Sequence, residues 1–125
     1  MVSARLHDIA ELYAPYNHDK MAATIIKPFV REQCTWCVAT HGAFQEIYYA
    51  DKISDNPNSR DRTAGHAYFD DCLEFCERWD QASFDPNYDT LDLEFFRPMI
   101  DKVFARAAFA ENVLNPGVRL ALCNT

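Results

Sequence analysis

Five side chains that can bind metal ions are spread over four segments of the sequence. They are an adjacent pair, His7 and Asp8, followed by His18, His41 and Asp80. Imidazole and carboxylate groups are hard-to-borderline ligands that bind divalent metal ions. Neighbouring residues on a helix point about 100° apart, so His7 and Asp8 can face one ion only where their helix ends or packs into a bundle interior. The five residues therefore predict a site for one or two divalent metal ions.

The spacing of apolar residues predicts the helices that must position these side chains. Apolar residues recur at helical spacing in five segments, which are residues 2–13, 18–27, 31–49, 66–79 and a last long helix that contains Pro98 and ends near residue 108. Polar, turn-rich segments lie at residues 51–62 and 83–90. With only 3 glycines among 125 residues and no Asn-Gly or Asp-Gly hairpin turn, the chain is predicted to be an all-α, single-domain protein.

The same periodicity predicts which side chains face the core. In the first two helices these are Val2, Leu6, Ile9, Ala10, Tyr13, Met21, Ala22, Ile25 and Ile26. In the third they are Val30, Cys34, Cys37, Val38, Phe44 and Tyr48, and in the last Phe95, Phe96, Met99, Ile100, Val103, Phe104, Ala107 and Ala108. His41 and Asp80 extend two of these apolar stripes. A buried ionisable group needs a partner, which favours a metal-binding role for both.

Each of these two residues also has a simpler interpretation. His41 could be a buried histidine that hydrogen-bonds a backbone carbonyl, without binding metal. Asp80 could turn out to solvent where its helix frays. His18 is expected at the start of the second helix, where its side chain can reach a neighbouring site, and Asn17 is expected to cap that helix.

Composition excludes several classes of partner. The formal net charge of −7, without a Lys/Arg cluster, would repel a nucleic acid, so a small-molecule ligand is expected. The polar N-terminal residues exclude the apolar core of a signal peptide, and no apolar run approaches the ~18 residues of a membrane span. These features predict a cytoplasmic protein that does not bind membranes.

The cysteines have three possible roles. The odd number of five and the absence of a signal sequence disfavour a disulfide framework. Two pairs have spacings that zinc accepts, but they lie on apolar helix stripes, where cysteine packs as a small hydrophobic residue. Core packing is therefore expected for Cys34, Cys37, Cys72 and Cys76.

Two motifs, Leu6-His7-Asp8-Ile9 and Arg78-Trp79-Asp80, together with the later lone histidines, resemble the HD-domain superfamily of metal-dependent phosphohydrolases. The closer resemblance is to its oxygen-using branch, which includes myo-inositol oxygenase and phosphonate-cleaving diiron oxygenases. Segments 14–18, 41–45 and 84–89 also resemble uncharacterised bacterial members of this branch. The resemblance covers roughly residues 5 to 106, and it implies an HD-type helical domain over residues 1–110 with a C-terminal extension over residues 111–125.

The resemblance implies a set of metal ligands and a weaker set of substrate contacts. The ligands are His7, Asp8, His18, His41 and Asp80, with the carboxylate of Asp8 bridging two ions. The first histidine of the family pattern has no counterpart here, because only six residues precede His7. Gln45 stands where phosphonate oxygenases have a lysine, Glu11 stands where they have a histidine, and His66 matches a histidine that relatives carry besides their ligands. The changes at Gln45 and Glu11 argue against a phosphonate substrate, which needs cationic contacts.

The function that the resemblance implies is that of a diiron oxygenase, which uses dioxygen to cleave a small hydroxylated metabolite. A second possibility is a phosphohydrolase that uses Mn or Mg to attack a phosphoester. A third is a helical domain of the same ancestry that has lost catalysis, which the absent histidine favours.

Overall fold

The structure, a computed structural model, describes residues 1–53 and 55–114. Its elements, in chain order, are α1 (Val2–Leu6), α2 (His18–Ile26), α3 (Glu32–Ile53), the 3-10 helix η1 (Ser59–Thr63), α4 (Phe69–Phe75), the π-helix η2 (Cys76–Asp80), the 3-10 helix η3 (Gln81–Phe84), α5 (Leu93–Phe104) and α6 (Glu111–Leu114). The described residues form helices and no strand, which confirms the all-α prediction. None of these helices is long and apolar enough to cross a membrane.

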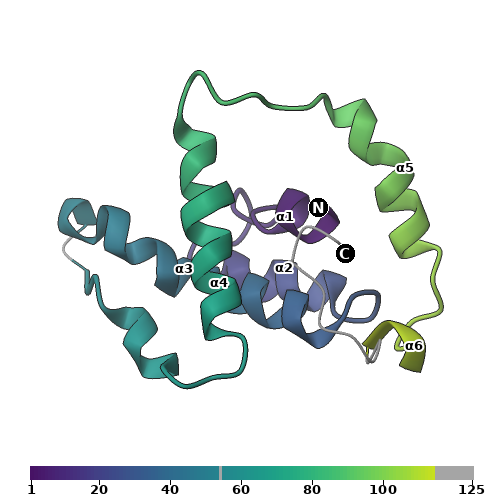
Figure 1. Ribbon diagram of the computed structural model, residues 1–125, viewed down its shortest axis with the longest axis horizontal. Coiled ribbons are helices and arrows are strands. Elements are labelled where there is room, and N and C mark those ends of the chain that lie inside the picture. Colours follow the sequence, from purple (N-terminus) through teal and green to yellow (C-terminus); the bar gives the residue numbers. More distant parts are fainter. Residues whose placement is uncertain (54, 115–125) are drawn as a thin grey trace.

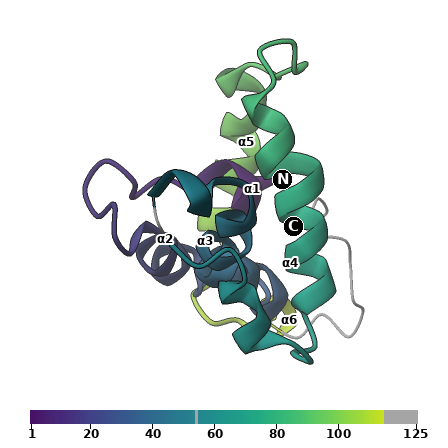
Figure 2. The same ribbon diagram turned by 90° about the vertical axis from the view of Figure 1, so that its left-hand side faces the viewer.

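Helix α3 is the centre of the fold. It packs against α2 on one side and against α4 and η2 on the other, and Figure 2 shows it between α2 and α4. Two apolar clusters meet on it. The first joins α1, α2, α3 and α5 through Val2, Leu6, Ala22, Ala23, Ile26, Val30, Cys34, Val38 and Val103. The second joins α3 to α4 and η2 through Cys37, Phe44, Cys72, Phe75 and Cys76.

The cysteine prediction is confirmed for the four described residues. Cys34, Cys37, Cys72 and Cys76 are buried as free thiols in these two clusters. Hydrogen bonding with Cys72, together with burial, raises the pKa of the Cys37 thiol well above its usual range. All four side chains act as core residues because they are buried among the apolar groups of these clusters. Cys123 lies outside the described residues.

The first helix is much shorter than the predicted span of residues 2–13. It ends at Leu6, and residues 7–13 continue as turns closed by short backbone bonds, such as Ile9 N–H to Leu6 C=O (3.1 Å) and Glu11 N–H to Asp8 C=O (2.9 Å). As a result Ile9 and Tyr13 are exposed, at 50% and 80%, rather than in the core. The tertiary contacts of His7 and Asp8 outweigh the local helical pattern in this segment.

Helices α2 and α3 follow the prediction more closely. Ala22 and Ile26 are buried as predicted, whereas Met21 and Ile25, on the flank of the same stripe, are exposed. Asn17 stands at the N-cap position of α2, but its side chain makes no capping hydrogen bond. Helix α3 runs past residue 49 to its end at Ile53, and Tyr48 lies exposed near that end.

The second half of the chain departs from regular α-helix in several places. The polar segment 51–62 contains the end of α3 and most of η1, and the helix predicted over residues 66–79 consists of α4 followed by the π-turn η2. Helix α5 begins at Leu93, where Asp92 Oδ1 accepts a hydrogen bond from Glu94 N–H (3.2 Å), and it continues through Pro98.

The predicted apolar stripe of α5 is only partly buried. Val103 is in the core, and Met99, Ile100 and Phe104 pack against its edge. Phe95 is exposed, as are Ala107 and Ala108, which lie beyond the end of the helix. Figure 1 shows the reason, since α5 lies across α1 from α4, and the chain between η3 and α5 arches over the space between them.

The predicted C-terminal extension, residues 111–125, begins with the short helix α6. The rest of that predicted segment, residues 115–125, lies outside the described residues.

Candidate metal centre

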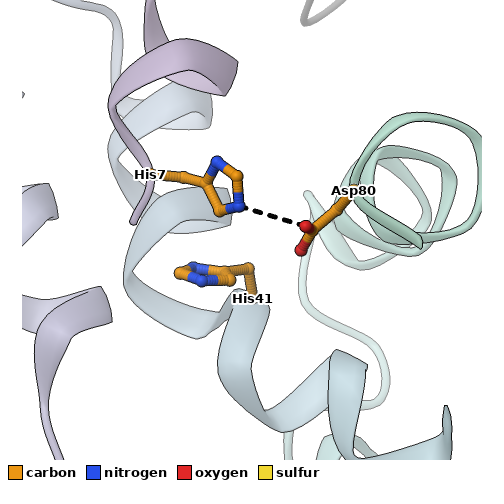
Figure 3. Close-up of side chains that lie close together, drawn as sticks. All are labelled: His7, His41 and Asp80. Carbon is orange, nitrogen blue, oxygen red and sulfur yellow. Dashed lines mark hydrogen bonds and ion pairs between the residues drawn. The ribbon is translucent and has the colours of Figure 1, made fainter. Parts of the chain in front are cut away.

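Four separate segments bring the five predicted ligands to one point. His7 and Asp8 follow directly on α1, His18 is the first residue of α2, His41 lies in the middle of α3, and Asp80 ends η2. Because α1 ends at Leu6, the turn that follows lets the two neighbouring side chains face the same place. Figure 3 shows His7 and Asp80 reaching toward each other above the ring of His41.

All three imidazoles are held in the same way. The Nδ1 atom of each ring hydrogen-bonds the backbone carbonyl three residues earlier in the chain: His7 to Ala4 (2.7 Å), His18 to Pro15 (3.2 Å) and His41 to Val38 (2.7 Å). Nδ1 must carry the proton in these bonds, because the carbonyl is only an acceptor. Each neutral ring therefore presents the lone pair of Nε2. Metal-binding histidines in proteins are typically oriented in this way.

The two oxygens of Asp8 face different histidines. Oδ1 lies 3.2 Å from His18 Nε2 and 3.1 Å from His41 Nε2, whereas Oδ2 lies 3.0 Å from His7 Nε2. On the far side of His7, its Nε2 lies 3.1 Å from Asp80 Oδ1. Asp8 thus stands between a group formed with His18 and His41 and a group formed with His7 and Asp80.

The spacing of these atoms fits metal coordination. Donors that share one ion at about 2.1 Å lie roughly 3.0–3.4 Å apart, because the angles between them are about 90–109°. The contacts measured here run from 3.0 to 3.3 Å. Two sets of three donors lie close enough to hold an ion, His7 with His41 and Asp80, and Asp8 with His18 and His41. His41 belongs to both sets, so it lies between the two candidate positions.

Two Nε2 atoms meet directly in this cluster. Those of His18 and His41 are 3.3 Å apart. Since Nδ1 carries the proton in both rings, the two lone pairs would repel each other unless a proton or a metal ion lies between them. A cation between the two nitrogens would therefore be favourable at this point.

The ionisation of the metal-free cluster also favours a positive charge among these side chains. Burial alone would lower the pKa of His7, but its contacts with the carboxylates of Asp8 and Asp80 outweigh this effect and raise it to about 10. Burial alone would raise the pKa of Asp8, but its contacts with His41 and His7 hold it well below its usual range. Without metal, the carboxylates therefore keep a proton on His7 at neutral pH, and a divalent ion would replace that proton.

Asp80 reaches the cluster because the helix widens before it. The backbone N–H of Gln81 bonds the carbonyl of Cys76, five residues back, instead of the usual four. Asp80 is only 6% exposed, which excludes the interpretation of a frayed acid turned to solvent. Single π-turns of this kind are rare and often lie at functional sites.

The surroundings of His41 and His7 are apolar and closely packed. The Cys76 thiol lies 3.8 Å from the carbonyl of His41, and the ring of Phe75 meets the ring of His7 edge to face at 5.4 Å. His41 itself is 2% exposed. The Nδ1 atom of His41 bonds a backbone carbonyl, as in a buried histidine without a metal-binding role. Its Nε2 atom also contacts Asp8 and His18, and a purely structural role does not account for these contacts.

A cavity of about 520 Å³ adjoins the cluster. His7, Asp8 and Asp80 form part of its wall, whereas His18 and His41 do not. A small molecule in this cavity would therefore meet the His7 and Asp80 side of the cluster.

No family model, curated protein or solved structure matches this chain. The resemblance to HD domains therefore remains a prediction from the sequence motifs, and the candidate site is supported by its own geometry.

The two residues predicted as weaker substrate contacts lie outside the cavity wall. Gln45 is buried one turn beyond His41, and neither amide atom of its side chain has a hydrogen-bond partner among the described residues. His66 stacks on Trp36 with ring centroids 4.0 Å apart, and its Nδ1 accepts a hydrogen bond from Tyr68 N–H (3.2 Å). His66 therefore packs on the outer side of α3, apart from the metal-binding cluster.

Several cavity residues were not singled out from the sequence. Ser3 and Arg5 come from α1, Trp79 from η2, Leu91 from the segment before α5, and Phe96 from α5. Trp79 stood in the Arg78-Trp79-Asp80 motif, and Phe96 stood on a stripe that was predicted to be core. Apolar periodicity does not distinguish a side chain that fills a core from one that lines a cavity.

Proposed function

We propose that His7, Asp8, His18, His41 and Asp80 form a dinuclear metal centre of the HD-domain kind, and that the chain is a metal-dependent enzyme for a small molecule. The observation that carries this proposal is the orientation of the three imidazoles. Each has Nδ1 fixed by a carbonyl and Nε2 directed at Asp8 or Asp80, at 3.0 to 3.2 Å. Independent structural histidines have no reason to share this arrangement.

Two further features support two ions rather than one. The oxygens of Asp8 face separate histidines, as a bridging carboxylate requires. His7, Asp80 and one oxygen of Asp8 would hold one ion, and His18, His41 and the other oxygen of Asp8 would hold the second. Three protein donors leave coordination positions for substrate or water, which is typical of catalytic rather than structural metal sites.

Within this proposal, iron and an oxygenase reaction are favoured over hydrolysis. Imidazole with carboxylate is a common donor set for non-haem iron, and the sequence motifs most resemble the oxygen-using branch. Bound iron would supply the oxygen chemistry, while the chain's own residues hold the metal and shape the substrate cavity. A phosphoester would need several cationic contacts, and Arg5 is the single lysine or arginine among the described residues of the cavity wall.

Elemental analysis of the purified chain tests the metal centre. We expect about two iron or manganese ions per chain after reconstitution, with most of that metal lost in His41→Ala and in Asp80→Ala. His66→Ala is the matched control, because His66 lies outside the cluster and its loss should leave the metal content unchanged. Full metal occupancy in both site variants would refute the ligand assignment.

The same preparations distinguish the reactions. Oxygen uptake by the iron-loaded protein in the presence of an alcohol would support the oxygenase. Release of phosphate from a phosphoester with Mn or Mg would instead support the hydrolase, and a protein that holds no metal at all would support a non-catalytic domain.

A further inference from the structure

The cavity beside the metal-binding cluster gives information on the substrate class. It lies among α1, α3, η2 and α5, and the segment that arches between η3 and α5 in Figure 1 forms part of its wall through Tyr88, Asp89, Thr90 and Leu91. Its volume of about 520 Å³ is within the range of cavities that bind small molecules. The substrate class that this wall indicates rests on the proposed metal centre.

The wall is mainly apolar. Aromatic and aliphatic side chains contribute much of it, namely those of Phe75, Trp79, Tyr88, Phe96, Val38 and Leu91. A polyol such as an inositol carries a hydroxyl on every carbon, and each hydroxyl that loses water must find a partner. An apolar wall satisfies few of them, so this cavity suits a molecule with an apolar body.

The charged groups of the wall do not form an anion site. Arg5 is exposed, and its guanidinium lies 5.3 Å from the ring centroid of Phe96, to which it is directed. Asp89 provides an opposite charge on the same wall. Apart from His7, Asp8 and Asp80 at the metal centre, Arg5 and Asp89 are the charged side chains of the described wall, and they balance, so the part of the wall away from the metal favours a ligand body without charge.

One buried polar group in the wall has no partner. Ser3 is only 5% exposed, and its hydroxyl has no hydrogen-bond partner among the described residues. It lies one helical turn before His7, which corresponds to about 6 Å along the axis. A buried hydroxyl without a partner is unfavourable, so rotation of this hydroxyl toward the cavity, which Ser3 lines, would let it gain a hydrogen bond with a ligand group.

We infer that this cavity binds a neutral, mainly apolar alcohol, in which an aryl or alkyl body lies against Phe75, Trp79 and Phe96. The hydroxyl of this molecule reaches the His7 and Asp80 side of the metal centre. Ser3 hydrogen-bonds a second polar group of the ligand, about one helical turn away. The substrate class is thus an aryl- or alkyl-substituted alcohol rather than a polyol or a phosphate ester.

Binding measurements test this inference without depending on turnover. The probes are 2-phenylethanol, myo-inositol and phenyl phosphate, titrated by calorimetry and ligand-observed NMR into the full chain, both metal-free and manganese-loaded. We expect 2-phenylethanol to bind at least about tenfold more tightly than either other probe.

Two pairs of variants locate the site. Phe96→Ala should weaken binding of 2-phenylethanol about tenfold, whereas Phe95→Ala, which changes the exposed neighbouring ring outside the cavity wall, should change it less than about twofold. Ser3→Ala should weaken binding of a longer probe, 2-phenyl-1,3-propanediol, roughly 3- to 10-fold. Thr35→Ala is its control, because Thr35 also has a buried hydroxyl without a partner but does not line the cavity.

The outcomes separate this inference from the proposed function. If the protein holds metal but binds myo-inositol or phenyl phosphate as tightly as 2-phenylethanol, the inference is overturned and the metal centre stands. Equal effects of Phe96→Ala and Phe95→Ala would overturn it as well. If the protein holds no metal, the proposed function fails. Binding of 2-phenylethanol to the metal-free protein, with loss of affinity in Phe96→Ala, would still show that the cavity binds an apolar alcohol, and absence of that binding would overturn the inference.

Discussion

Replacement of Asp8 by asparagine is the sharpest test of the dinuclear arrangement. The amide keeps the shape of the carboxylate and one of its oxygens, but its NH₂ group cannot bind a cation and its charge is zero. In the structure, Oδ1 and Oδ2 of Asp8 face three different imidazoles at 3.0 to 3.2 Å. Asp8→Asn should therefore leave at most one ion bound, with affinity reduced roughly 100-fold or more, about 3 kcal/mol.

The expected loss of metal exceeds any effect on folding. The Asp8 side chain is 42% exposed, so water screens its ion pairs with the histidines in the metal-free protein. Such a contribution to the free energy of unfolding is about 1 kcal/mol, which leaves the variant folded. Circular dichroism and urea unfolding of the metal-free proteins should show this small difference.

The assay is metal content by elemental analysis, with affinity from competition against a chelator. Asp19→Asn is the matched control, since Asp19 follows His18 directly and pairs with Lys20 (3.4 Å) rather than with the cluster. If Asp8→Asn keeps two ions at unchanged affinity, Asp8 does not bridge them. If Asp19→Asn loses as much metal, the loss in Asp8→Asn reflects the change in net charge, and the position of Asp8 between the histidines does not explain it.

Four further predictions concern pH and the core. Because the folded pKa of His7 is raised from 6.5 to about 10, its stabilising contribution to the metal-free protein is full below pH 6.5 and is lost as the pH rises through about 10. Urea unfolding should therefore give a free energy lower by roughly 2–4 kcal/mol at pH 10 than at pH 6, and a flat profile would contradict the pairing. Metal binding displaces that proton, so apparent affinity should rise about tenfold per pH unit between pH 6.5 and 10, as measured by chelator competition. Phe44→Ala should lower the free energy of unfolding by about 3–5 kcal/mol, since Phe44 is 1% exposed, and Cys72→Ala should lower it by about 1–2 kcal/mol with metal content unchanged.

The helical fold was predictable where apolar periodicity and burial coincide. Helix α3 is the best case, because Cys34, Val38 and His41 stand at helical spacing and all lie in its buried faces. The prediction was wrong where contacts across the fold decide the backbone. Residues 7–13 carry a helical pattern, yet they form turns because His7 and Asp8 both contact other segments.

Residue types and burial costs indicated His41 and Asp80 as candidate ligands, and the resemblance to HD domains implied the full set of five. An acid and a histidine on apolar stripes require partners, and the structure places Asp80 against His7 and His41 against Asp8. The cavity was not predictable in the same way. Its wall depends on how far α5 lies from α4, and the spacing of Phe96 along the sequence contains no information on that distance.

The wide turn of η2 has a consequence for how this chain can be compared with others. A π-turn holds one more residue than an α-turn, so winding this same sequence as a regular α-helix would rotate the acid by about 100° around the axis. A relative with an ordinary helix here would need its aspartate one position earlier. Alignments that forbid a gap inside this helix would then pair Asp80 with the wrong residue, and would miss a shared site that superposition of the side chains would reveal.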